Sequence, residues 1–162
     1  MSLDQHVREM EEWRAVVGKA LVGFGDLELI TYKCLAHLPS EKIADTSSRL
    51  GFALRVDLIV EILEGRENKS ERILAFVRML KRAKCLAQTR NDIAHNPVML
   101  NVFAHEASGD FALERCIATA RGGRIIDLAA AKEFADEVES LAAEMWLQIG
   151  KLSEGEPSST RG

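Results

Sequence analysis

The feature that most constrains the fold is a run of apolar residues that recur every three or four positions between residues 7 and 38. Its members are Val7, Met10, Trp13, Val17, Leu21, Phe24, Leu27, Thr31, Leu35 and Leu38. This spacing marks one face of an α-helix, and its phase continues through three glycines, Gly18, Gly23 and Gly25. The sequence predicts one long helix that starts after Ser2, can bend at the glycines and ends before Pro39.

Three further helices are expected from the same spacing. The second runs from about Ser48 to Leu63, the third starts after the cap residue Ser70 and ends before Pro97, and the fourth starts after Asp127. Their expected buried residues are Phe52, Val56, Ile59 and Leu63; Ile73, Val77, Leu80, Ala83, Ala87 and Ala94; and Leu128, Phe134, Val138, Leu141, Met145 and Ile149.

The pattern changes between the third and fourth helices. The runs "VMLNVFAHE" and "FALERCIAT" flank the turn-like stretch "ASGD", and "RGGR" leads into "RII". We therefore expect an all-α protein, an antiparallel four-helix bundle with a small β-hairpin insertion at about residues 98–126. The bundle forms a single domain over residues 1–150, and the polar segment 151–162 is expected to be a disordered tail.

Composition excludes several classes of protein. Of the 162 residues, 47% are hydrophobic, which suffices for one core, and the net charge of −4 argues against a basic nucleic-acid-binding surface over the whole molecule. No apolar run is long enough for a membrane span, and the charged N-terminus is unlike a signal peptide, so we expect a cytoplasmic protein. The cysteines lie far apart, and Cys34 with His37 would supply two ligands at most, so neither a metal nor another cofactor is expected.

The stretch "TRNDIAHNP", at residues 89–97, concentrates polar chemistry at the end of the third helix. Asn91 and His95 are four residues apart and share a helix face, and Asp92 is a neighbour of His95 at three residues. Arg90 is rotated by roughly 140° from His95 around an ideal helix. The arginine and the histidine therefore flank a target, or they act together with a second chain.

A short basic stretch precedes this motif on the same helix. Arg78, Lys81 and Arg82 could follow the backbone of a polyanion such as RNA toward Arg90. The alternative is a solvated helix face whose charges are balanced by Glu71 and other acidic residues.

The string "RNDIAH" resembles the R-x4–6-H signature of the HEPN superfamily, in which a polar residue often follows the arginine. The long first helix, with "FGDLELITYKCL", is similar to the first core helix of that family and carries Glu28 among apolar residues. The resemblance covers most of residues 1–150. It implies a homodimeric, metal-independent endoribonuclease, often a toxin or a phage-defence effector that is paired with an antitoxin protein.

The resemblance also implies roles for individual residues. His95 would act as general base or acid, Arg90 would stabilise charge on the phosphate, and Asn91 would orient the phosphate or His95. Asp92 and Glu28 are candidate supporting residues, and Glu28 either pairs with Arg90 or His95 or lies in water at the edge of its stripe.

Two other hypotheses remain open at this point. A non-catalytic HEPN-like module would dimerise, or would bind RNA or a nucleotide without cutting it. A purely structural bundle would use Arg90 and His95 as a polar helix end, with the histidine near the last carbonyl groups.

Overall fold

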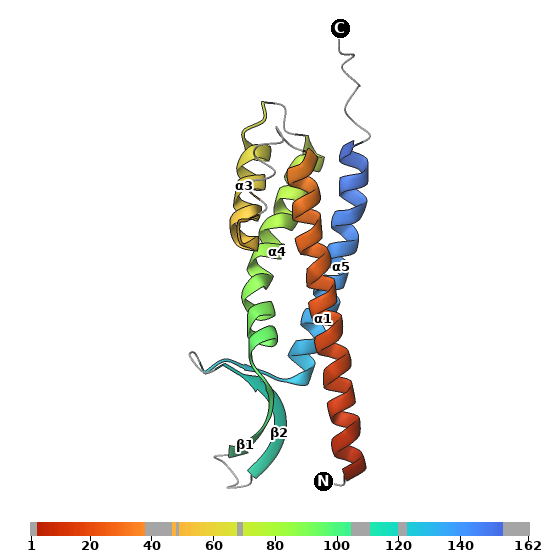
Figure 1. Cartoon of the computed structure of the whole chain (residues 1–162), viewed down its shortest axis with the longest axis vertical. Helices are drawn as coiled ribbons and strands as arrows, with labels where there is room; N and C mark the ends of the chain where they lie inside the picture. Colours follow the sequence, from red (N-terminus) through yellow and green to blue (C-terminus); the bar gives the residue numbers. More distant parts are fainter. Residues whose placement is uncertain are drawn as a thin grey trace. The chain divides into compact units, whose positions relative to one another are not determined.

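The computed structural model describes residues 3–37, 47, 49–67, 70–104, 111–119 and 123–153, and for 150–153 it describes the backbone alone. Over these residues the chain forms the helices α1 (Leu3–His37), α3 (Phe52–Glu64), α4 (Glu71–His95) and α5 (Leu128–Ser153). Between α4 and α5 lie the strands β1 (Val98–Ala104), β2 (Phe111–Ala118) and β3 (Ile125–Ile126) (Figure 1). The predicted helical protein with a small β insertion is confirmed at this level.

The chain is divided into two compact units. The first contains residues 1–22 and 88–137, and the second contains residues 23–87 and 138–162. The helices α1, α4 and α5 each have one end in the first unit and the other end in the second unit. That residues 1–150 form a single domain stays a prediction.

In the second unit, α1 and α3 run in the same direction. The rings of Phe24 and Phe52 meet edge to face at 4.9 Å, and Arg55 Nε donates to Thr31 Oγ1 at 3.0 Å. Residue numbers rise together along the two helices, so the antiparallel arrangement predicted for this pair is wrong.

The helices α3 and α4 are antiparallel, as predicted. Lys81 Nζ pairs with Glu64 Oε1 at 2.8 Å, and Lys84 Nζ pairs with Asp57 Oδ1 at 2.6 Å. The position on α3 falls as the position on α4 rises, and Figure 1 shows the two helices side by side. The buried apolar side chains of this unit include Leu27, Ile30, Leu35, Val56, Ile59, Leu63, Phe76, Val77, Leu80, Val138, Leu141 and Met145.

In the first unit, the first half of α1 lies beside the start of α5 and runs in the same direction, so the antiparallel arrangement predicted for the first and last helices is also wrong. Lys19 Nζ pairs with Asp136 Oδ1 at 2.6 Å, and Lys132 pairs with Glu12. Here α1 buries Trp13, Val16 and Ala20, whereas the expected Val7 and Leu21 are exposed. The expected series and the buried series both recur every three or four residues, and both include Phe24. Helical spacing alone therefore could not decide which series is buried before Phe24.

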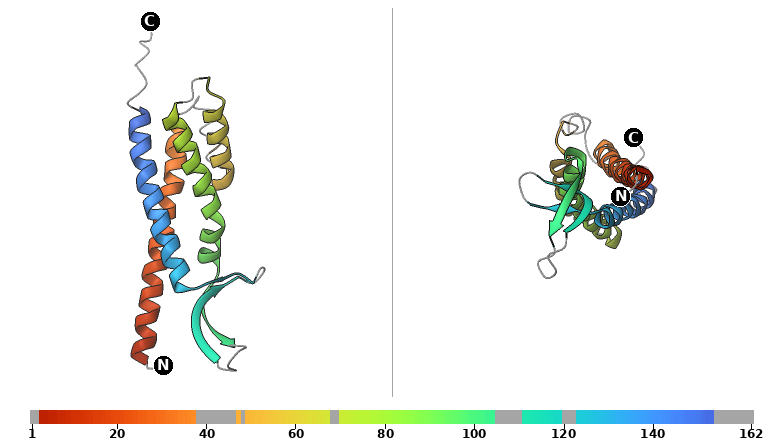
Figure 2. Two further views of the ribbon diagram at one scale, coloured as in Figure 1. Left: turned by 180° about the vertical axis from the view of Figure 1, so that it is seen from behind. Right: turned by 90° about the horizontal axis from the view of Figure 1, so that it is seen from below.

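The sheet of the first unit is antiparallel, with the order β1-β2-β3. Val98 pairs with Ile117 and Ala104 with Phe111, and Ile117 also pairs with Ile126 of β3. Figure 2 shows β1 and β2 as a curved ribbon that follows the end of α4. Ile117 and Ile126 are buried, so the ribbon is anchored at the end where β3 pairs with it.

Helix starts follow the predicted caps where they are described. Ser70 Oγ accepts from the backbone N–H of Ile73 at 3.3 Å, and Asp127 Oδ1 accepts from Ala130 at 2.7 Å. The helix α3 begins at Phe52, after Gly51, rather than near Ser48. At its other end α5 extends to Ser153, into the segment predicted as a tail. The proposed cap Ser2 and residues 154–162 lie outside the described residues.

Among the described residues, no helix has the length and apolar character that a membrane span requires. The cytoplasmic location stays a prediction.

Two glycines of α1 offer a matched test of this packing. A Cβ at Gly25 meets no atom within 4 Å, whereas a Cβ at Gly23 lies 3.1 Å from Cγ1 of buried Val138. We expect Gly25→Ala to raise the free energy of unfolding by about 1 kcal/mol, the difference in helix propensity. In Gly23→Ala the crowding of the stiff valine should cancel that gain. Chemical denaturation measures both, and equal gains would contradict the assigned contact.

Candidate functional site

The polar motif closes α4 in a well-defined helix end. Asn96 Nδ2 donates to the backbone carbonyl of Asp92 at 2.8 Å and so satisfies one of the last free carbonyl groups of the helix. Pro97 follows and cannot continue the helix, so β1 starts at Val98. The predicted end before Pro97 is confirmed, although Ile93 is buried here and the expected Ala94 is exposed.

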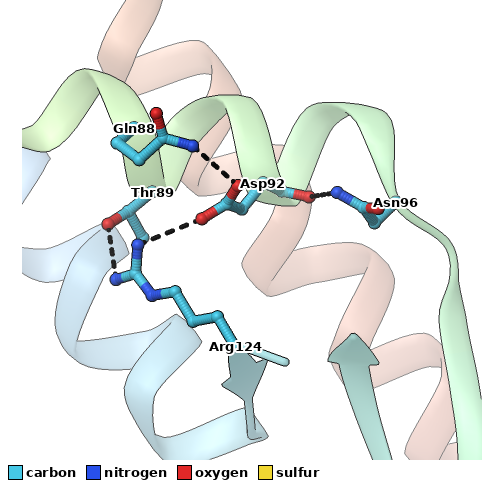
Figure 3. Close-up of polar contacts among 5 residues, drawn as sticks. All are labelled: Gln88, Thr89, Asp92, Asn96 and Arg124. Atoms are coloured by element: carbon cyan, nitrogen blue, oxygen red, sulfur yellow. Dashed lines mark hydrogen bonds and ion pairs between the residues drawn. The ribbon is translucent and has the colours of Figure 1, made fainter. Parts of the chain in front are cut away.

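A buried carboxylate ties this helix end to the segment before β3 (Figure 3). Asp92 is buried and accepts from Gln88 Nε2 at 3.0 Å through one oxygen and from Arg124 Nη1 at 3.0 Å through the other. Arg124 Nη2 also donates to Thr89 Oγ1 at 2.9 Å. One guanidinium therefore holds two positions of the last turns of α4, and we call Asp92, Arg124, Thr89 and Gln88 the Asp92 clamp.

Sequence reasoning missed Arg124. It lies 32 residues after Asp92 in a stretch that was interpreted as a turn, and nothing in its spacing points to α4. The adjacent Gly123 has φ of 61°, a left-handed conformation that glycine adopts without strain. Arg124 follows Gly123 immediately before β3, and from there its side chain reaches the helix.

The adjacent face of the same helix end is exposed to solvent. Asn91 and His95 are both exposed and, being four residues apart, share one face. Arg90 is half-buried, and its Nη1 donates to Asn91 Oδ1 at 3.1 Å. The long arginine side chain thus bends toward the face of Asn91 and His95, which reduces the angular separation expected from the backbone.

Asp92 supports the motif as part of the scaffold. One of its carboxylate oxygens accepts a hydrogen bond from Gln88 and the other accepts one from Arg124. Asp92 is buried, whereas His95 is exposed. Its role is therefore to fix the helix that carries His95.

The predicted RNA-binding residues occupy another part of α4, in the second unit. Arg78 pairs with Glu71 at 2.8 Å and Lys81 with Glu64 at 2.8 Å, while Arg82 is exposed. Glutamates thus offset the charge of the first two cations. Glu28 belongs to the same unit and is half-buried, and its supporting role stays a prediction.

The described residues contain no group of three or more His, Cys, Asp or Glu side chains that could hold a metal ion. Cys34 is buried, and this burial raises the pKa of its thiol to about 12. His37 Nδ1 lies 2.7 Å from the carbonyl of Lys33, so that ring nitrogen bonds to the backbone of its own helix. A thiolate at Cys34 is disfavoured, whether as a ligand or as a nucleophile.

No family model, curated protein or solved structure matches the chain. The case for a function therefore rests on the geometry of the motif and on its resemblance to the HEPN signature.

The Asp92 clamp predicts different effects for two adjacent residues. Asp92→Ala removes the acceptor for two side chains in a buried place and should lower the free energy of unfolding by about 1–3 kcal/mol. Asn91→Ala changes an exposed residue of the same turn and should alter it by less than about 0.5 kcal/mol. Urea denaturation of both variants tests this, and similar midpoints would show that the clamp does not hold the helix end.

Cysteine reactivity tests the environment of Cys34. At pH 8, well below its raised pKa, the thiol stays protonated and buried, whereas Cys85 is exposed. We expect iodoacetamide to label Cys85 first and Cys34 only after unfolding, as followed by peptide mass spectrometry. Equal labelling rates in the native protein would contradict the burial of Cys34.

Proposed function

We propose that this chain is a HEPN-like, metal-independent endoribonuclease in which Arg90, Asn91 and His95 act at a homodimer interface. The observation that carries the proposal is the hydrogen bond from Arg90 Nη1 to Asn91 Oδ1, on the face that also exposes His95. One helix end therefore carries a guanidinium that can bind an anion, an amide and an imidazole that can transfer a proton.

The chemistry follows from these three side chains. The ribose 2′-oxygen attacks the adjacent phosphorus, a histidine takes the 2′ proton, and the bond from phosphorus to the 5′-oxygen breaks as that oxygen gains a proton. The guanidinium of Arg90 donates to the phosphate oxygens as their charge grows. The products are a 2′,3′-cyclic phosphate and a 5′-hydroxyl, and DNA is inert because it lacks the attacking group.

A homodimer supplies what one copy lacks. The reaction needs a base at the 2′-oxygen and an acid at the 5′-oxygen, and each chain carries one histidine in the motif. Two motifs that meet across a two-fold axis provide both, together with two arginines for one phosphate. A rigid helix end suits this arrangement, because acid–base catalysis requires its groups within hydrogen-bond reach of the substrate. A partner antitoxin stays part of the proposal through the family resemblance alone.

The ion pairs of the preceding stretch favour a second candidate function. Because Glu71 and Glu64 offset Arg78 and Lys81, the helix offers little net positive charge along which a long RNA could run. A module that binds a nucleotide or an RNA end at Arg90 and His95 without cutting it needs only the positive charge of Arg90.

Cleavage of RNA in EDTA at near-neutral pH tests the proposed function. Wild type should cut and leave cyclic phosphate ends, whereas Arg90→Ala and His95→Ala should lose roughly 10²-fold or more of the activity, since each removes a group that acts in the transition state. Both residues are at least partly exposed, so the variants should keep the thermal stability of wild type.

The matched control is Arg78→Ala, which removes an arginine of the same helix that is paired with Glu71. It should retain most of the activity if the motif performs the chemistry. RNA binding without cleavage by any of the proteins would reject the ribonuclease and leave the binding module.

A further inference from the structure

The outer edge of β1 is open in the part of the chain that the structure describes. The sheet has the order β1-β2-β3, so β1 bonds to a neighbour on one side only. In both vertical views β2 lies between β1 and the first half of α1 (Figures 1 and 2). The contact of Arg115 on β2 with Glu9 of α1, at 3.3 Å, agrees with this order. The backbone groups on the free side of β1 are therefore available to another strand.

Edge strands in stable monomers are usually protected by lysine, proline or a bulge. The sequence of β1, VMLNVFA, contains no charged residue and no proline. Its pairing with β2 continues without interruption from Val98 opposite Ile117 to Ala104 opposite Phe111, so it has no bulge. None of the three protective features is present in β1.

One face of the ribbon exposes apolar side chains of both strands, and it also carries Arg115, which lies opposite Leu100, is 8% exposed in its side chain and pairs with Glu9 of α1. Because residues opposite each other in a sheet share a face, Leu100 and Val102 of β1 lie on the same side as Leu113 and Phe111 of β2. Their exposed fractions are 44%, 64%, 64% and 73%. The same side is buried further along, at Ile117, so the uncovered part is the half of the ribbon nearest the β1–β2 connection.

The edge is complementary to itself. If two copies of β1 pair antiparallel about Asn101, Leu100 of one copy lies opposite Val102 of the other, and Val98 lies opposite Ala104. Side chains of even residue number then meet side chains of even residue number, so the apolar face continues across the junction. The absence of charge in β1 also means that two copies of an acidic protein meet here without repulsion between facing side chains.

We propose that the free edge of β1 pairs with the same edge of a second copy and forms a continuous six-stranded sheet. This gives the open backbone groups hydrogen-bond partners and extends the apolar face formed by Leu100, Val102, Phe111 and Leu113. A second copy fits this edge better than a charged peptide does, because β1 offers no charge for recognition, and a second β1 places its own Leu100 and Val102 beside the exposed apolar side chains of the first.

This interface is distinct from the one in the proposed ribonuclease. His95 lies six residues before Asn101, which amounts to about 20 Å along an extended chain from the axis of the paired sheet. The two motifs therefore do not meet across this axis. If both interfaces form, the protein is a tetramer with two kinds of two-fold contact.

Light scattering after size-exclusion chromatography of the full chain tests the proposal, with Val102→Lys and Leu113→Lys as a matched pair. Both residues are 64% exposed, lie opposite each other and share the apolar face, but only Val102 is on the edge strand. Val102→Lys should halve the mass of the assembly, because it places each lysine opposite the apolar Leu100 of the other copy, with the two lysines as diagonal neighbours across the junction. Leu113→Lys and the conservative Val102→Thr should keep the mass of wild type.

An unchanged mass for Val102→Lys would overturn the proposal. An equal loss of mass with Leu113→Lys would also overturn it, since that result indicates that the second copy covers the apolar face and does not pair with the edge of β1. Circular dichroism and thermal melting of each variant confirm that the fold is kept. The residual state separates this inference from the proposed function. A dimer left by Val102→Lys agrees with a second interface at the motif, whereas a monomer shows that the edge was the whole interface and contradicts the composite catalytic site.

Discussion

The candidate site depends on one ion pair, between the buried Asp92 near the end of α4 and the exposed Arg124 before β3. The carboxylate is almost fully buried, and a buried charge is tolerated only where it is paired and hydrogen-bonded. Gln88 and Arg124 supply these hydrogen bonds, and Thr89 Oγ1 accepts a further one from Nη2 of the same guanidinium. The last turns of α4 are thereby fixed in rotation, with Asp92 inward and Asn91 and His95 outward.

That rotation explains how one short motif combines structural and chemical residues. Asp92 stabilises the helix end, Asn96 closes it, and Arg90, Asn91 and His95 are left at or near the surface. A site of this kind can change its exposed residues without loss of the fold, because the hydrogen bonds of the clamp do not involve Asn91 or His95.

Much of the fold could be predicted from periodicity and caps. The spacing in the fourth predicted helix identified Phe134, Val138, Leu141 and Met145 as buried, and Ser70 and Asp127 cap their helices as expected. The direction of α3 relative to α1 could not be predicted, because it depends on the path of a long connection. Near the end of α4 the burial of Ile93 in place of Ala94 follows from size, since the larger side chain gains more from leaving water.

The site was predictable only in part. The motif itself is local in sequence, so its residues could be listed, and helix geometry placed Asn91 beside His95. Arg124 could not be found, because a contact between residues far apart in the chain leaves no periodic signal. The bend of Arg90 toward Asn91 was equally hidden, since backbone geometry separates them and only the side-chain rotamer brings them together.

The most direct measurement of the central claim is an NMR titration with a 2′-O-methyl RNA oligonucleotide, which carries the phosphates but cannot be cut. We expect shifts of the His95 ring and of the side chains of Arg90 and Asn91, with the signals of Asp92 and Arg124 unchanged. Shifts centred on Arg124 and Asp92, or no shift at His95, would contradict the claim that the outward face of this helix end is the binding site.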